Sequence, residues 1–111
     1  MTRVLLIDEN ADHAQQLGLV LAQRGLTVVR AADIEESIRN LRKPGLIYDL
    51  VILIMADRSR PWLKVLHKFQ QACLQAAFLE TPLFLCVAKL QFGPEFQLQI
   101  EQRGARYVFE G

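Results

Sequence analysis

Acidic side chains stand just past two apolar runs of this sequence. Asp8 and Glu9 directly follow the run Val4–Ile7, and Asp57 comes shortly after the run Leu50–Met55. Carboxylates in such places could hold a hard divalent cation or accept a transferred phosphoryl group. No glycine-rich phosphate loop and no nucleophile-elbow motif accompanies them anywhere in the chain.

Two histidines and two cysteines are the other candidate ligands. His13 and His67 fall on expected helices among polar neighbours, and neither has a second ligand at metal spacing on its own helix face. We therefore predict both to be surface side chains. Cys73 and Cys86 lie in apolar segments, which is typical of reduced thiols in a core.

Length and composition narrow the class of protein. The 111 residues suffice for one domain, residues 1–111, and 51% hydrophobic residues give it a core. With 13 basic and 12 acidic residues, the net charge of +1 gives no reason to expect nucleic acid or a membrane as partner. No apolar run approaches the roughly 20 residues of a membrane span, and the N-terminus does not resemble a signal peptide. We expect a cytoplasmic protein.

Strands and helices are expected to alternate along the chain. Apolar runs predict strands, and apolar residues at helical spacing predict the helices between them. The expected strands are Val4–Ile7, Thr27–Ala31, Leu50–Met55, Leu83–Val87 and Tyr107–Phe109. The expected helices are Ala11–Arg24, a helix capped by Asp33 and Glu36 that carries Ile34, Ile38 and Leu41, Pro61 to about Leu79, and one between Gly93 and Gly104.

This alternation predicts an α/β fold. Right-handed crossovers would build a parallel sheet with helices on both faces. Five strands with short loops suit a doubly wound, flavodoxin-like sheet of order 2-1-3-4-5. The acidic residues would then lie at the carboxyl edge of the sheet, where α/β proteins usually bind their ligands.

The sequence resembles the receiver domain of bacterial response regulators over nearly its whole length. The segments that carry the likeness are VLLIDEN, GLTVVRAADIEESIRNL, YDLVILI, TPLFLCVA and GARYVFEG. In that family three carboxylates hold Mg²⁺, and one of them accepts a phosphoryl group that a hydroxyl and a lysine bind. The family also has a fifth helix after its fifth strand, which we expect to be absent from this chain because it stops at Gly111.

The resemblance places the family's functional positions on residues that lack the required groups. Asp8 and Glu9 match the acidic pair. The acceptor aligns with Ile54, the hydroxyl position with Val87, and the lysine position falls near Glu110. We therefore expect a degenerate, pseudo-receiver site with no catalytic residue. Its only metal ligands would be Asp8 and Glu9, which would hold Mg²⁺ weakly or not at all.

Three functions are compatible with these residues. The first, which we expect, is a phosphorylation-independent signalling module that is not an enzyme and acts by contact with a partner protein or as a homodimer. An effector domain could follow Gly111. The second is a phosphoacceptor switched by a histidine kinase through Asp57, although three residues of strand would put Asp57 about 10 Å from Ile54. The third is a small-ligand sensor that uses the crevice at the carboxyl edge.

One face of the expected sheet would be incompletely covered. Helices pack about 8–10 Å apart and strands lie about 4.8 Å apart, so the helix Ala11–Arg24 alone is too narrow for that face. Exposed apolar patches of this size usually mark an interface. The sequence therefore predicts that a second chain or a further helix covers this face.

Overall fold

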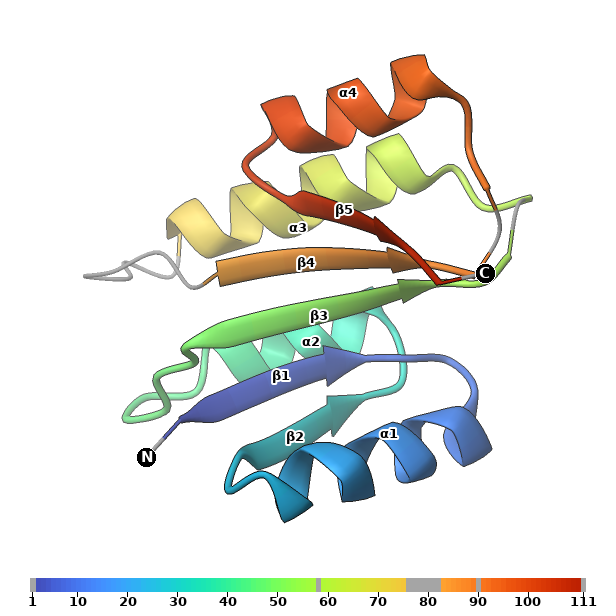
Figure 1. The fold of residues 1–111 in the computed structure, drawn as a ribbon. Helices are drawn as coiled ribbons and strands as arrows, with labels where there is room; N and C mark the ends of the chain where they lie inside the picture. Colours follow the sequence, from blue (N-terminus) through green and yellow to red (C-terminus); the bar gives the residue numbers. More distant parts are fainter. Residues whose placement is uncertain (1, 58, 76–82, 90, 111) are drawn as a thin grey trace.

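Strands and helices alternate from one end of the chain to the other (Figure 1). The structure is a computed structural model that describes residues 2–57, 59–75, 83–89 and 91–110. The strands are β1 (Arg3–Ile7), β2 (Thr27–Ala31), β3 (Leu50–Met55), β4 (Leu83–Ala88) and β5 (Arg106–Phe109). The helices are α1 (Ala11–Gln23), α2 (Ile34–Leu41), α3 (Trp62–Gln75) and α4 (Pro94–Gln102).

The five strands form one parallel sheet in the order β2-β1-β3-β4-β5. This confirms the predicted flavodoxin-like fold, and four helices accompany the strands within the described residues. The expected end of the third helix near Leu79 lies outside those residues, beyond Gln75. None of the helices in the described part is both long and apolar enough to cross a membrane.

The helix boundaries follow from local sequence signals. The Asp33 carboxylate accepts a hydrogen bond of 2.8 Å from the Glu36 N–H, and the Glu36 carboxylate accepts one of 3.0 Å from the Ala32 N–H. The predicted cap of α2 is therefore confirmed, with the glutamate reaching one residue further back than a standard capping box requires. Gly25 follows α1 with a φ of +83°, a conformation that ends a helix at low cost only for glycine.

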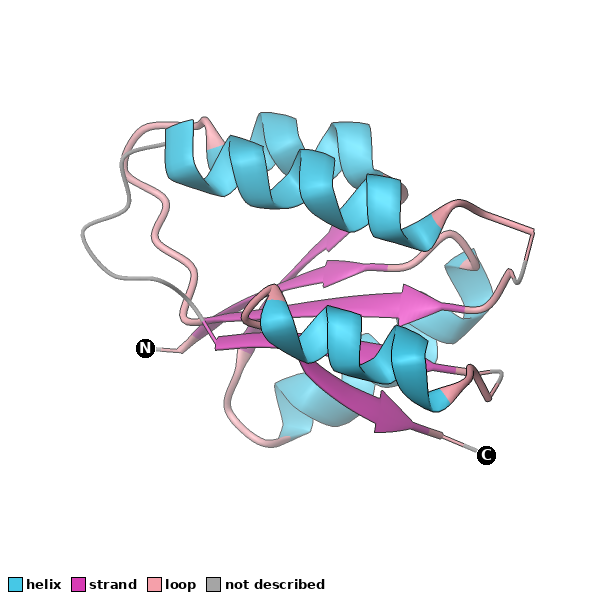
Figure 2. Cartoon of the chain, turned by 90° about the horizontal axis from the view of Figure 1, so that it is seen from above, coloured by secondary structure: helices cyan, strands magenta, loops and turns pink. Residues whose placement is uncertain are grey.

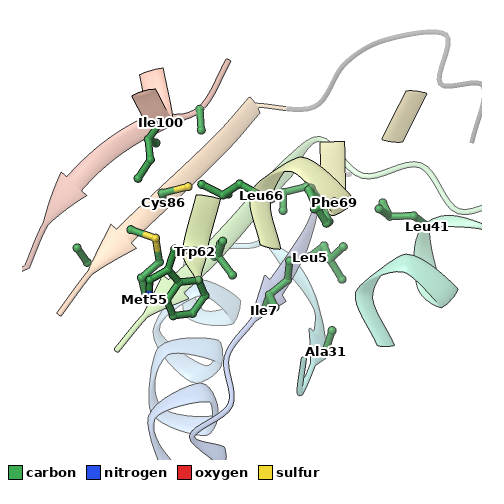
Figure 3. Close-up of a cluster of buried hydrophobic side chains, with 14 of the residues drawn as sticks. Leu5, Ile7, Ala31, Leu41, Met55, Trp62, Leu66, Phe69, Cys86 and Ile100 are labelled. Atoms are coloured by element: carbon green, nitrogen blue, oxygen red, sulfur yellow. The ribbon is translucent and has the colours of Figure 1, made fainter. Parts of the chain in front are cut away.

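The larger part of the core lies between the sheet and the helices α2, α3 and α4 (Figure 3). Phe69 of α3 packs on Phe84 of β4 with ring centroids 5.1 Å apart. Cys86 is fully buried in this layer with a free thiol, as predicted for a reduced core cysteine. The side chain of Cys73 lies outside the described residues.

The opposite face of the sheet carries only α1 among the described helices, and Figure 2 shows the sheet as a middle layer between the two sets of helices. In Figure 1, α1 lies beside β2, at the edge of the sheet opposite to the edge formed by β4 and β5. Ile52 and Ile54 of β3 are nevertheless only 6% and 4% exposed. On this face β5 is less covered than these two positions of β3, since Val108 is 40% exposed.

Candidate functional site

A hollow of about 290 Å³ opens where β1 and β3 end, and we call it the acid hollow. It brings together the three carboxylates that the sequence singles out, Asp8, Glu9 and Asp57. Three residues of extended strand would keep Asp57 about 10 Å from Ile54 and out of this pocket. Asp57 nevertheless lines the pocket, because β3 ends at Met55 and Asp57 sits in the loop that follows. The residues that line the acid hollow are Asp8, Glu9, Asn10, Ile54, Ala56, Asp57 and Trp62.

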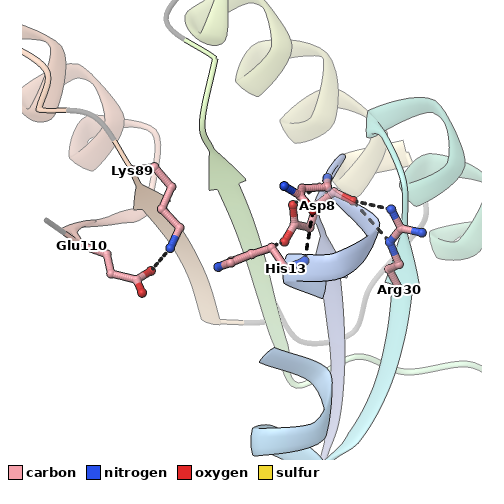
Figure 4. A network of polar contacts seen from close by, with 6 residues as sticks. Asp8, His13, Arg30, Lys89 and Glu110 are labelled. Carbon is pink, nitrogen blue, oxygen red and sulfur yellow. Dashed lines mark hydrogen bonds and ion pairs between the residues drawn. The ribbon is translucent and has the colours of Figure 1, made fainter. Parts of the chain in front are cut away.

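Asp8 is buried, and both oxygens of its carboxylate are occupied (Figure 4). One oxygen accepts a hydrogen bond of 3.0 Å from the Asn10 N–H, and the other faces Nδ1 of His13. The backbone carbonyl of Asp8 accepts a hydrogen bond of 2.9 Å from the guanidinium of Arg30 on β2. Asp8 therefore joins β1, β2 and the first turn of α1, which is a structural role.

His13 is not the free surface histidine that the sequence predicts. Its side chain is 24% exposed, and its ring pairs with the carboxylate of Asp8. The prediction was wrong because it considered only ligands on the same face of α1 as His13. The partner of His13, Asp8, precedes α1 and directly follows β1. His67 is exposed, as predicted. The signal that could have found the pair is the spacing of an acid at a strand end and a histidine in the next helical turn.

Replacing His13 by alanine should lower the free energy of unfolding by about 1–3 kcal/mol, because the buried Asp8 carboxylate loses a partner. Urea denaturation at pH 7 measures this, with Asp8→Asn and the double variant completing a double-mutant cycle. His67→Ala is the matched control and should change stability by less than about 0.5 kcal/mol. If the double-mutant cycle gives no coupling free energy between His13 and Asp8, these two side chains do not stabilise each other.

The other two acids are exposed and are engaged with neighbours. The Glu9 carboxylate forms a 2.6 Å ion pair with Arg60, in which both side chains are more than 40% exposed, so the pair contributes little to stability. The Asp57 carboxylate accepts hydrogen bonds from the Ser59 hydroxyl at 2.7 Å and the Ser59 N–H at 2.9 Å. These two bonds lower the pKa of Asp57 below its ordinary value, so the group is ionised at neutral pH.

Hydrocarbon fills the positions where the resemblance places the phosphorylation chemistry. Ile54 on β3 pairs in register with Val87 on β4, and neither side chain can accept a phosphoryl group or donate a hydrogen bond. Glu110, at the lysine position, forms a 3.0 Å ion pair with Lys89 and does not line the acid hollow (Figure 4).

The acid hollow fits a divalent cation poorly. Within residues 2–57, 59–75, 83–89 and 91–110, no three His, Cys, Asp or Glu side chains are grouped so as to hold a metal. Mg²⁺ needs several oxygen ligands in octahedral geometry. One carboxylate oxygen of Asp8 already accepts a hydrogen bond from Asn10, and the other is paired with His13. One carboxylate oxygen of Asp57 already accepts hydrogen bonds from Ser59.

A second hollow of about 370 Å³ adjoins the first, between α2 and α3. Its apolar wall includes Ile34 and Val65, and its rim carries charges of both signs. Lys68 of α3 pairs with Glu35 of α2 across this hollow. Because the charges balance, this hollow does not select a ligand class by its electrostatics.

Three solved structures of similar fold are receiver domains or response regulators. A two-component response regulator from Clostridium difficile matches with a TM-score of 0.77 at 20% identity, over 99% of this chain and 84% of that one. Chemotaxis protein CheY4 of Vibrio cholerae matches with a TM-score of 0.76 at 20% identity, over 99% and 85% of the two chains. The non-phosphorylated HemR receiver domain of Leptospira biflexa matches with a TM-score of 0.74 at 22% identity, over 99% and 82%.

Sequence comparisons add nothing to this structural likeness, since no family model and no curated protein matches the chain. At identities of 20–22%, the likeness establishes the architecture and not the chemistry of the site. The order of the five parallel strands agrees with it. The chain therefore has the receiver-domain fold of two-component response regulators.

Proposed function

We propose that this chain is a phosphorylation-independent, receiver-like signalling module that acts by protein–protein contact and not as an enzyme. The observation that carries the proposal is the burial of Ile54, 4% exposed, at the position where the resemblance puts the phosphoryl acceptor. An isoleucine has no oxygen that could attack phosphorus. Val87 beside it has no hydroxyl that could bind the phosphoryl oxygens.

The polar groups around this edge of the sheet support the same proposal. Phosphoryl transfer needs cations and hydrogen-bond donors aimed at the transferred group. Here Lys89 pairs with Glu110, and Arg60 pairs with Glu9. These two basic side chains are therefore engaged with acids, and the buried acid Asp8 is bound by His13.

A second candidate function is phosphorylation on Asp57. Its support is the position of Asp57 on the wall of the acid hollow, with an exposed, ionised carboxylate near Asp8 and Glu9. A carboxylate in that state is a competent nucleophile for an acyl-phosphate product. The neighbours of Asp57 disfavour the role, since Ser59 already binds its carboxylate twice.

Treatment with acetyl phosphate and Mg²⁺ should leave the mass of the intact chain unchanged, because the acceptor position is Ile54. Beryllofluoride with Mg²⁺ should likewise leave its NMR spectrum unchanged. A receiver domain with an aspartate at the acceptor position, treated in parallel, is the positive control. A phosphoryl adduct that disappears in Asp57→Asn would refute the proposal and establish the second candidate.

A further inference from the structure

We infer that the amino edge of the sheet docks the carboxyl edge of a second copy of this chain, so that copies associate head to tail. The inference deepens the proposed function, on which it rests in one respect: it names the partner of a module that works by contact. It comes from the distribution of charge. Although the net charge is only +1, the charged side chains are separated into two edges of opposite sign.

The amino edge of the sheet is basic. All five strands are parallel, so they begin at one edge, and the helices between them run back and end there (Figure 1). We call the stretches from the last turn of each helix to the first two residues of the next strand, together with the start of β1, the basic edge. In the part of the chain that the structure describes, it holds two acids, Asp49 and Glu101, and seven bases. The seven bases are Arg3, Arg24, Arg39, Arg42, Lys43, Arg103 and Arg106.

The carboxyl edge has the opposite sign. We call the stretches from the last two residues of each strand to the first turn of the next helix, together with the residue after β5, the acidic edge. Within the described ranges it holds nine acids and four bases. The acids are Asp8, Glu9, Asp12, Asp33, Glu35, Glu36, Asp57, Glu95 and Glu110. The bases are Arg30, Arg60, Lys64 and Lys89.

Several of these charges are available to a partner. The exposed side chains that form no salt bridge with any described residue include, at the basic edge, Arg24, Arg39, Lys43 and Arg106, and at the acidic edge, Asp12, Asp33, Asp57 and Glu95. The pairs Glu9–Arg60 and Glu110–Lys89 already neutralise each other within the acidic edge. Each edge therefore presents mainly one sign of charge to solvent.

Helix dipoles explain why these residues stand where they do, but they do not cancel the excess. Arg24, Arg42 and Arg103 are the C-cap residues of α1, α2 and α4, where a cation interacts favourably with the helix dipole. Each helix end carries about half a charge, so four helices contribute roughly two charges that oppose the side chains at each edge. Seven bases against two acids exceed that contribution.

The two edges cannot neutralise each other within one molecule. The six residues of β3 hold them about 20 Å apart at 3.3 Å per residue. The Debye length is about 10 Å at 0.1 M salt, so charges at this separation are largely screened from each other. A second copy that is displaced along the strands brings its acidic edge into direct contact with the basic edge, where the attraction is not screened.

Charge also favours a head-to-tail contact over a two-fold dimer of the edges. In a two-fold contact a surface meets itself, and either edge would then face like charges. The acidic edge of a second copy has the opposite sign and the same width, because both edges cross the same five strands. Such a contact leaves one edge free on each outer copy, so chains of copies lengthen with concentration. Exposed ion pairs are individually weak, and we expect a dissociation constant of about 10⁻⁴ M at low salt.

Sedimentation equilibrium of the full 111-residue chain, from about 20 μM to about 1 mM, measures this association. At about 10 mM salt the mean mass should rise with concentration, and at about 500 mM salt it should stay that of the monomer, because the Debye length falls from about 30 Å to a few ångström. The control is a variant with four substitutions, Lys43→Glu, Arg106→Glu, Asp12→Lys and Glu95→Lys. This variant keeps the net charge of +1 but has much weaker edges, so it should stay monomeric at both salt concentrations.

Two half-blocked variants test the head-to-tail geometry. Lys43→Glu with Arg106→Glu blocks the basic edge, and Asp12→Lys with Glu95→Lys blocks the acidic edge. Each variant alone should be monomeric, whereas their mixture should form complexes of two chains that grow no further. In the mixture, backbone NMR signals should shift at the acidic edge of the first variant and at the basic edge of the second. The spectrum of each variant alone shows that it is folded, and a variant that is not is replaced by its neutral counterpart with Gln or Asn.

Three results would overturn the inference. One is a wild-type chain that stays monomeric up to about 1 mM at low salt. Another is association that survives in the variant with four substitutions, which would locate the contact elsewhere. The third is a wild-type complex that stops at two copies, which would indicate a two-fold dimer. No phosphoryl donor is present in these experiments. Head-to-tail association of a chain that acetyl phosphate modifies would therefore refute the proposed function alone, and a monomeric chain that acetyl phosphate does not modify would refute this inference alone.

Discussion

Replacing Ile54 by aspartate should lower the free energy of unfolding by about 3–5 kcal/mol at pH 7. Ile54 is 4% exposed and packs in the apolar cluster of β1, β3 and α1. The new carboxylate would lose its water and would share the acid hollow with the buried Asp8 and with Glu9. Desolvation and like charge both raise the pKa of a carboxyl, so the penalty should decrease as the pH is lowered toward 5.

Two matched variants separate the charge from the shape. Ile54→Asn has nearly the shape of the aspartate variant without its charge. Ile54→Val should lower the free energy of unfolding by only about 0.5–1.5 kcal/mol. Mg²⁺ should recover part of the loss in Ile54→Asp and none in Ile54→Asn, because the cation binds the folded state through the added carboxylate. Urea denaturation with and without Mg²⁺ measures all three. If Ile54→Asp is as stable as the wild type without metal, the pocket is hydrated and open.

The stability of the wild type should decline above about pH 9 through Cys86. Burial raises the pKa of this thiol from its ordinary 9.0 to about 12. The unfolded chain therefore releases the thiol proton at a lower pH than the folded chain does. The contribution to stability is complete below pH 9 and is lost between pH 9 and about 12. The decline should be about 1.4 kcal/mol per pH unit within this window.

Cys86→Ala removes the group and is the control, since other side chains also titrate in this range. The difference in free energy of unfolding between wild type and Cys86→Ala should therefore shrink as the pH rises from 8 to 10.5. In a Cys73→Ser background, Cys86 is the one remaining thiol, and iodoacetamide should label it only after denaturation. Rapid labelling of the native chain would show that the β4 layer of the core opens readily.

The fold was predictable because its signals are local. The apolar runs of β1, β3 and β4 need cover on both faces, and caps such as Asp33 define the helix ends from neighbouring residues alone. The strand order followed from the alternation of elements, since short right-handed crossovers leave few arrangements.

The site was predictable only where a strand fixes its geometry. Ile54 and Val87 lie side by side because both belong to strands in register. The partner of Asp8 was missed because His13 reaches it across a loop, which helical periodicity does not describe. The position of Asp57 was missed because the distance per residue of a strand no longer holds after Met55.

The hydrocarbon at Ile54 and Val87 has a consequence for how such a module could be regulated. A conformational equilibrium responds to a ligand only by as much as the ligand binds one state better than the other. If no group at the carboxyl edge is phosphorylated, as we propose, that edge offers no ligand to shift the populations of two states. The output of a phosphorylation-independent module would then follow mass action, through the concentrations of the chain and its partner. Control would lie in synthesis, degradation or competition for the partner.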